Sequence, residues 1–306
     1  MGNLFRLLGV LLCLLSSPVH AKNFAQTKYP IVLVHGMYGF DSILGIVDYF
    51  YKIPYKLKKH GADVHVARIT SLGKTELRGE QLLEQVENII ALTGRAKVHL
   101  IGHSHGVPTA RYVASVRPDL VASVLGVAGP NHGSAVADLV VDNINDEGPL
   151  GKIAGTIATS LAKIISFLST TRSPGQEDFW ASINALSTHE AARFNRIHQT
   201  ALSSNCQDGP EMDSDGVRYF SMGGDRAMTS ILDPLDLPFL TTKKLAFKDQ
   251  KADGLVSICS SRLGKSLRKQ YPMNHLDFIN HVLTFGAKGI ESIYINYANH
   301  LRSLSL

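Results

Sequence analysis

The stretch KVHLIGHSHGVPTARYVASV, residues 97–116, decides the fold. Residues 97–101 are mostly apolar and predict a buried strand, and residues 108–116 predict a helix with its proline in the first turn, where proline is tolerated. Between them, residues 102–106 (GHSHG) fit the pattern G-x-S-x-G. So short a pattern arises by chance in roughly one 300-residue chain in ten. The strand before it and the helix after it make this instance informative.

A serine on so tight a turn projects its hydroxyl above the edge of a sheet, and small residues on either side let strand and helix approach each other. The hydroxyl is a weak nucleophile at neutral pH, so it needs a general base that is in turn oriented by a carboxylate. We therefore expect Ser104 to act as a nucleophile. In this strand–turn–helix setting, the acid and then the histidine follow the serine along the chain.

The C-terminal part of the chain offers three histidines as the base: His275, His281 and His300. His275 stands in the loop-like segment YPMNHLD (271–277), and loops readily carry such residues. His281 falls inside the apolar helix expected to follow, so position favours His275 as the base.

Position alone leaves the acid open among six residues, namely Asp213, Asp215, Asp225, Asp233, Asp236 and Asp253. A glycine follows Asp253 in KADGLV (251–256) and permits a tight turn that could aim the carboxylate. For an aspartate that is not the acid, a turn or a helix cap is the expected role. Negative charge on a reacting oxygen also needs two backbone N–H groups. We expect them from His105 and, in the loop after an early strand, from Met37.

The elements around this stretch alternate between strand and helix. Further elements outside 97–116 are expected as strands at 29–36, 62–69, 121–128, 217–222 and 245–247, and as helices at 42–60 (interrupted by Pro54), 78–92 and 151–168. Such alternation predicts a parallel sheet with helices on both faces. Residues 130–200 show no convincing strand, and the amphipathic helix at 151–168 is expected as an insertion between strands.

The N-terminal segment differs in composition from the rest of the chain. Residues 1–21 read as a signal peptide, with Arg6 before the apolar run 7–15 and a small-residue cleavage site at 18–21. The remaining residues, 22–306, are expected to form a single domain.

Of the three cysteines, Cys13 lies in the signal peptide, which leaves Cys206 and Cys259 for a disulfide or as two free thiols. The net charge of +5 comes without a dense Lys/Arg block, so nucleic-acid binding is not expected.

At this point the chain resembles the family I lipases of Gram-negative bacteria, typified by those of Pseudomonas and Burkholderia. The matching segments are YPIVLVHGMYGFDSILG (29–45), RGEQLLEQVE (78–87), KVHLIGHSHG (97–106), ARYVASVRPDL (110–120), LDP (232–234), ADGLV (252–256), CSS (259–261) and MNHLD (273–277). The resemblance implies an α/β-hydrolase fold with a mostly parallel central sheet, helices on both faces and an inserted helical lid at about 134–170.

The resemblance also implies roles for individual residues. It makes Ser104, Asp253 and His275 a catalytic triad and gives the oxyanion site to the amides of Met37 and His105. It pairs Cys206 with Cys259. It further implies one structural Ca²⁺ ion, a cation that prefers oxygen ligands. The implied ligands are the carboxylates of Asp233 and Asp277 and the carbonyls of His281, where the family usually has glutamine, and Phe285.

The implied activity is hydrolysis of triacylglycerols at a lipid–water interface by a secreted enzyme that reaches the medium through the periplasm. A dedicated foldase is a possible partner, and a monomer is expected. Two rival functions are considered: a short-chain carboxylesterase or a hydrolase of phospholipids or polyesters, and a non-catalytic module that binds lipid or protein. Modules of the second kind usually lose a triad member or an oxyanion loop, whereas every such element is present here. Because pocket shape decides among substrates, the triad does not separate the esterase from the lipase.

Overall fold

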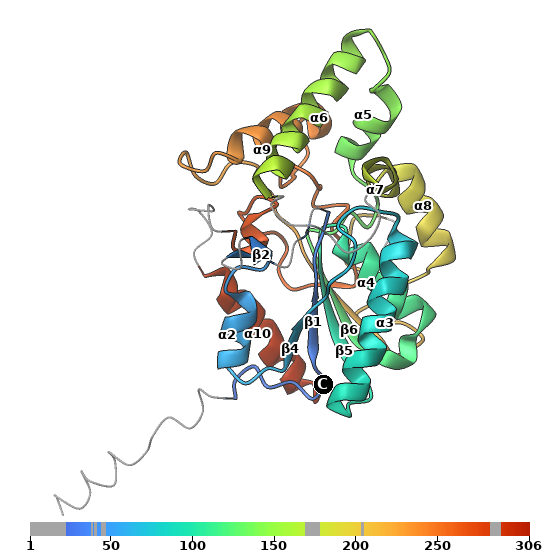
Figure 1. Ribbon diagram of the computed structural model, residues 1–306, viewed down its shortest axis with the longest axis vertical. Helices are drawn as coiled ribbons and strands as arrows, with labels where there is room; N and C mark the ends of the chain where they lie inside the picture. The colour runs from blue at the N-terminus through green and yellow to red at the C-terminus, as the bar shows by residue number, and fades with distance from the viewer. Residues whose placement is uncertain are drawn as a thin grey trace, which may run out of the picture.

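The computed structural model describes residues 23–37, 39, 42–43, 47–168, 178–202, 205–281 and 289–306 (Figure 1). The expected signal peptide, residues 1–21, lies outside them. Within these ranges a parallel sheet has the strand order β4-β1-β5-β6-β7-β8. Its strands are β1 (Ile31–Val34), β4 (Val64–Val66), β5 (Val98–His103), β6 (Val121–Val127), β7 (Arg218–Met222) and β8 (Lys265–Ser266). The predicted parallel sheet is confirmed.

Helices cover both faces of the sheet and also lie beyond one of its edges. They are α2 (Ile53–Lys59), α3 (Thr75–Thr93), α4 (Gly106–Val116), α5 (Ala135–Asn143), α6 (Pro149–Leu168), α7 (Phe179–Ala185), α8 (Thr188–Ile197), α9 (Asp236–Thr242) and α10 (Ile290–Ser303). Short helical turns are η1 (Pro118–Leu120), η2 (Lys243–Phe247) and η3 (Asp277–Ile279). None of the helices in the described ranges combines the length and hydropathy that crossing a bilayer requires.

The side chains of β1 point alternately to the two faces of the sheet, and all four residues are buried because both faces are covered. Ile31 and Leu33 pack into a core shared with α2 and α10, whereas Val32 and Val34 pack into a second core shared with α3 and α4. A strand buried on both faces needs apolar residues at every position, and β5 and β6 are buried throughout in the same way. The sheet is therefore a rigid support for the loops at its edge.

Four helices gather beyond one edge of the sheet. In Figure 1, α5, α6, α7 and α9 lie together at the top, above the strands. A third apolar cluster joins three of them to η2, with Val140 from α5, Ile157 from α6, Ile183 from α7 and Phe247 from η2, and α9 packs against α6. The predicted helix at 151–168 is part of this group as α6.

Three expectations about secondary structure are wrong. Residues 42–60 are not one helix: β2 (Ser42–Ile43) pairs antiparallel with β3 (Val47–Asp48), and α2 begins only at Ile53, because Pro54 suits the first helical turn. Residues 245–247 form no strand and belong to η2, whose apolar side chains pack against the helical cluster. His281 is outside any helix, since Asn280 in the left-handed region ends η3.

Cys206 and Cys259 form the expected disulfide, 53 positions apart. Cys206 precedes β7, and Cys259 follows the segment that contains Asp253. The bond therefore ties a loop near the fifth strand of the sheet to the loop that carries the expected acid. The alternative of two free thiols is excluded.

Candidate active site

The turn from β5 into α4 holds Ser104 in the predicted setting. Its φ of 54° lies in the left-handed region, which is uncommon for a residue other than glycine and marks a strained turn. The Ser104 amide donates to the Val127 carbonyl at 2.9 Å, which fixes the turn against β6. A Cβ on Gly102 would lie 2.3 Å from the Gly106 carbonyl oxygen, and one on Gly106 would lie 2.2 Å from the Val34 carbonyl oxygen. Both glycines of the motif are therefore required by packing.

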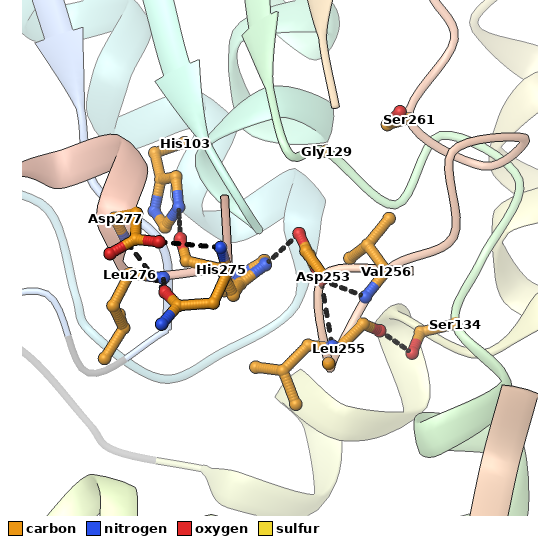
Figure 2. A network of polar contacts seen from close by, with 12 residues as sticks. His103, Gly129, Ser134, Asp253, Leu255, Val256, Ser261, His275, Leu276 and Asp277 are labelled. Carbon is orange, nitrogen blue, oxygen red and sulfur yellow. Dashed lines mark hydrogen bonds and ion pairs between the residues drawn. The ribbon is translucent and has the colours of Figure 1, made fainter. Parts of the chain in front are cut away.

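The structure brings His275 and Asp253 together from two loops (Figure 2). His275 Nδ1 lies 2.8 Å from Asp253 Oδ2, and both side chains are buried. The other carboxylate oxygen of Asp253 accepts the amides of Leu255 at 2.9 Å and Val256 at 2.7 Å. A carboxylate partner at Nδ1 keeps the proton there and leaves Nε2 free to accept one. Of the six aspartates considered, Asp253 is the one that contacts His275 within the described ranges.

Ser104 and His275 share one cavity. It is lined mainly by apolar side chains; those of α5, α6 and α7 are Val136, Ala137, Leu161, Phe179 and Ile183. His275 Nε2 is buried and has no hydrogen-bond partner among the described residues. An unpaired acceptor in the same apolar cavity as a serine hydroxyl suits a general base, and catalytic hydrogen bonds often shorten only when substrate binds.

The loop after β1 passes against the nucleophile. A Cβ on Gly36 would lie 2.7 Å from the Cβ of Ser104, so the backbone that leads into Met37 touches the serine. Met37 also lines the cavity, and His105 follows Ser104 directly at the start of α4. The two residues expected to supply oxyanion amides therefore flank the nucleophile.

Arg78 holds the loop after β1, a role that the sequence pattern did not predict. Its fully buried guanidinium donates to the carbonyl of His35 at 2.6 Å and to that of Gly36 at 3.3 Å. Burial and the Arg78 charge lower the pKa of His35 to about 3, so this histidine is neutral. The one sequence signal was an arginine on the apolar side of an otherwise amphipathic helix.

His103 connects the loop after β1, the turn that carries Ser104 and the loop that carries His275. The sequence pattern did not predict this role either. Its Nε2 lies 2.9 Å from the His275 carbonyl oxygen, so this nitrogen carries the proton and donates. Its Nδ1 then accepts from the Tyr49 hydroxyl at 2.7 Å, and that hydroxyl accepts from the Gly36 amide at 3.0 Å. Burial, and then the neighbouring His275, hold the pKa of His103 well below its usual range. The chain of bonds links the loop after β1, the nucleophile turn and the base.

The two expected calcium carboxylates lie beside the base. Asp233 and Asp277 are buried, and burial raises the pKa of each to about 6, with a further contribution from Asp236. Asp233 Oδ2 and Asp277 Oδ1 have no hydrogen-bond partner among the described residues. Buried, unpaired carboxylate oxygens fit a hard cation.

The rest of a cation site must come from neutral oxygens. The described ranges contain no group of three or more His, Cys, Asp or Glu side chains that could hold a metal, so carbonyls and water would complete the shell. His281 is buried, and Phe285 lies outside the described residues.

Comparisons with known proteins agree with this geometry. A family model described as alpha/beta hydrolase fold matches residues 29–179, so the predicted α/β-hydrolase fold is confirmed. A triacylglycerol lipase of Vibrio cholerae is 44% identical, over 93% of this chain and 91% of that protein. One from Pseudomonas fragi is 38% identical, over 92% of this chain and 98% of that protein. The crystal structure of a Bacillus licheniformis lipase superimposes with a TM-score of 0.61 at 20% identity, covering 92% of this chain and 94% of that one.

Proposed function

The chain belongs to the family of Gram-negative bacterial triacylglycerol lipases, and from this premise we propose that it hydrolyses triacylglycerols through an acyl-enzyme on Ser104. The observation that carries the proposal is the apolar cavity in which Ser104 meets His275, itself bound to Asp253. A long acyl chain needs such an apolar lining, because its methylene groups gain free energy on leaving water.

The mechanism follows from the positions of five residues. His275 Nε2 takes the proton of the Ser104 hydroxyl, whose oxygen attacks the ester carbonyl, while Asp253 holds the Nδ1–H and stabilises the imidazolium. The amides of Met37 and His105 donate to the oxyanion of the tetrahedral intermediate. His275 then protonates the departing glyceride alcohol. Water, activated by the same histidine, attacks the acyl-enzyme and releases the fatty acid and Ser104.

We place the whole reaction in one catalytic domain, 22–306, with residues 134–170 as a lid. The support is the position of α6, whose Leu161 lines the cavity that contains Ser104. Displacement of α5 and α6 at an oil surface would open that cavity and expose apolar side chains to lipid.

A Ca²⁺ ion is proposed between Asp233 and Asp277, with carbonyls of His281 and Phe285 as further ligands. When bound, it supplies positive charge that offsets two buried carboxylates and takes no part in the ester chemistry. Asp277 follows His275 by two positions and its Oδ2 accepts the Asn274 amide at 2.8 Å. The residues present would thus hold the loop that carries the base.

Export is proposed from the N-terminal sequence. Residues 1–21 would direct the chain to the periplasm, and an oxidising compartment suits the Cys206–Cys259 bond. Release to the medium, assistance from a foldase and a monomeric mature protein complete the proposal.

The deciding experiment compares the oxidised protein, with calcium, on emulsified long-chain triglyceride and on a dissolved short-chain ester. Faster release of fatty acid from the emulsion supports a lipase. Turnover of the dissolved ester alone would make the chain a carboxylesterase. Ser104→Ala is the matched control and should abolish both activities while leaving the thermal midpoint within the range of surface substitutions.

A further inference from the structure

The loop that leads into α9 and the first turn of that helix expose several large apolar side chains. Ile231 is 88% exposed, Leu232 69%, Leu237 68% and Met228 44%. Single exposed apolar residues are ordinary on protein surfaces. Four within ten consecutive positions form a local cluster, and such clusters mark interaction sites. We call these four side chains the apolar anchor.

The backbone of this loop is held in a defined shape. Asp236 is buried, and its Oδ2 accepts the amides of Thr229 at 2.6 Å and Ser230 at 2.7 Å. Its Oδ1 accepts from the Asn274 side chain at 2.7 Å. The loop is also fixed from within by buried Ala227, Leu235 and Phe239, which belong to the main core. The apolar anchor is thus presented by a braced loop, and its exposure is a property of that fold.

The charges in the same stretch have one sign at the surface. Between residues 226 and 244, Arg226 and Lys244 are exposed, while the two acids, Asp233 and Asp236, are buried. The accessible surface of this segment is therefore apolar and cationic. A lipid–water surface that carries carboxylate or phosphate groups is complementary to it.

The anchor lies on the side of the molecule that holds the cavity. α9 packs against α6 (Figure 1). A groove there is lined by Lys152 and Thr156 of α6 and by Thr241 and Lys244. α6 in turn contributes Leu161 to the cavity that contains Ser104. A surface that contacts the loop before α9 would therefore also face the proposed lid.

We propose that Met228, Ile231, Leu232 and Leu237 dock the protein on an anionic lipid–water surface. This inference rests on the proposed function, because it names the surface from which the same cavity draws its substrate. The apolar side chains enter the outer part of the lipid layer, and Arg226 and Lys244 face its negative groups. The anchor is separate from the lid, so binding does not require the lid to have moved.

The test separates docking from catalysis. Binding to phosphatidylcholine vesicles with added oleate is measured by co-sedimentation in an inactive Ser104→Ala background, with and without Ile231→Ser and Leu232→Ser. Returning two large apolar side chains to water should weaken binding by about tenfold or more. In the active protein, the same pair should slow hydrolysis of a triolein emulsion by a similar factor and change kcat/KM on a dissolved short-chain ester by less than about twofold.

Leu92→Ser is the matched control. Leu92 is 83% exposed but lies near the end of α3 remote from the site. The other end of α3 carries Thr75, which is bonded to His105, and Leu92 lies seventeen positions further along the helix, about 25 Å away. This variant should bind vesicles and hydrolyse the emulsion as the parent does.

Charge is tested with Arg226→Gln and Lys244→Gln, which should reduce the preference for oleate-containing over pure phosphatidylcholine vesicles. Three results would overturn the proposal. The variant with Ile231→Ser and Leu232→Ser could bind vesicles as the parent does, Leu92→Ser could weaken vesicle binding equally, or the double variant could lose kcat/KM on the dissolved ester as much as on the emulsion. If the parent protein hydrolyses no ester, the proposed function fails, and vesicle binding by the inactive protein still decides the role of the anchor.

Discussion

The two halves of the proposed active site are held in place by different means. The nucleophile turn, residues 102–106, joins β5 to α4; β5 and its neighbour β6 are buried on both faces, and the glycines of the turn touch neighbouring backbone. The acid–base loops, residues 252–256 and 273–277, lie outside regular secondary structure except for the start of η3. A disulfide, carboxylate–amide bonds and two buried carboxylates that each have one unpaired oxygen surround them. The sheet thus positions the nucleophile, whereas cross-links and proposed cation binding position its partners.

The largest effect is expected at the contact between Asp253 and His275. Asp253→Asn replaces the acceptor at His275 Nδ1 with an amide that can present its NH₂ group, which favours the wrong tautomer. We expect kcat on a dissolved ester to fall by about 10⁴-fold with little change in KM. Steady-state kinetics check this, with Asp225→Asn, another of the six candidate aspartates, as control. Comparable losses in both variants would remove Asp253 from the mechanism.

Opening the disulfide should destabilise the acid–base half more than the nucleophile half. Closing a loop with a sequence separation of 53 stabilises a fold by about 4 kcal/mol in the chain-entropy treatment. The Cys206→Ser, Cys259→Ser double variant should therefore lose a free energy of unfolding of that order in urea. Native-state hydrogen exchange should show the loss first around residues 252–262. If amide hydrogen exchange became faster in β5 by the same factor, the two halves would unfold as one unit.

Calcium removal should act on the same half through its carboxylates. At a hundredfold excess over Kd, a bound ion adds about 2.7 kcal/mol to the free energy of unfolding, which chelation should remove. Asp233→Asn should abolish this response and, at neutral pH, leave the chelated variant more stable than the chelated wild type, because it removes a buried carboxylate. If the thermal midpoint of the wild type were the same with calcium and with chelator, the proposed site would be contradicted.

The same carboxylates predict a pH dependence with a defined sign. The pKa values of Asp233 and Asp277 are raised to about 6 in the fold from a usual 3.8. The native state then binds more protons than the unfolded chain between these values, so this contribution is full below about 3.8 and is lost as pH rises through 6. Relative to Asp233→Asn, the chelated wild type should therefore lose stability between pH 4 and pH 7, and calcium should suppress that loss.

The sequence singled out Ser104, Asp253 and His275, which the fold brings to one place, whereas several elements predicted around them differ in type or bounds. Ser104 and Asp253 lie in short patterns, G-x-S-x-G and an aspartate–glycine turn, that contain much of their own geometry. His275 was favoured by its loop, although the helix expected after it does not contain His281. In residues 42–60 an apolar pattern suggested one helix, but a single proline set the start of a shorter one. Local patterns decide turns, whereas tertiary packing decides where an element begins.

Residues whose role depends on distant contacts gave no such pattern. Arg78 acts on carbonyls 42 and 43 positions away, and His103 acts on a carbonyl 172 positions away. Nothing near either residue in the chain indicates its partner. Asp236 likewise read as a turn residue, although it braces the loop before α9 and bonds Asn274. These residues join segments that the sequence presents separately, so only the folded chain reveals them.

The smallest effect tests whether the two halves are coupled through Tyr49. Tyr49→Phe removes the hydroxyl between the Gly36 amide and His103 Nδ1 and leaves both groups unpaired in a buried site, a cost of about 1–3 kcal/mol. Because His103 also holds the His275 carbonyl, we expect kcat on a dissolved ester to fall about tenfold while KM stays unchanged. Tyr297→Phe is the matched control, since it removes another buried hydroxyl, bonded to Ser123 at 3.2 Å, from the core beside α10. It should lower the thermal midpoint without changing kcat. An equal kcat in the two variants would show that sheet and cross-links align nucleophile and base without this chain of hydrogen bonds.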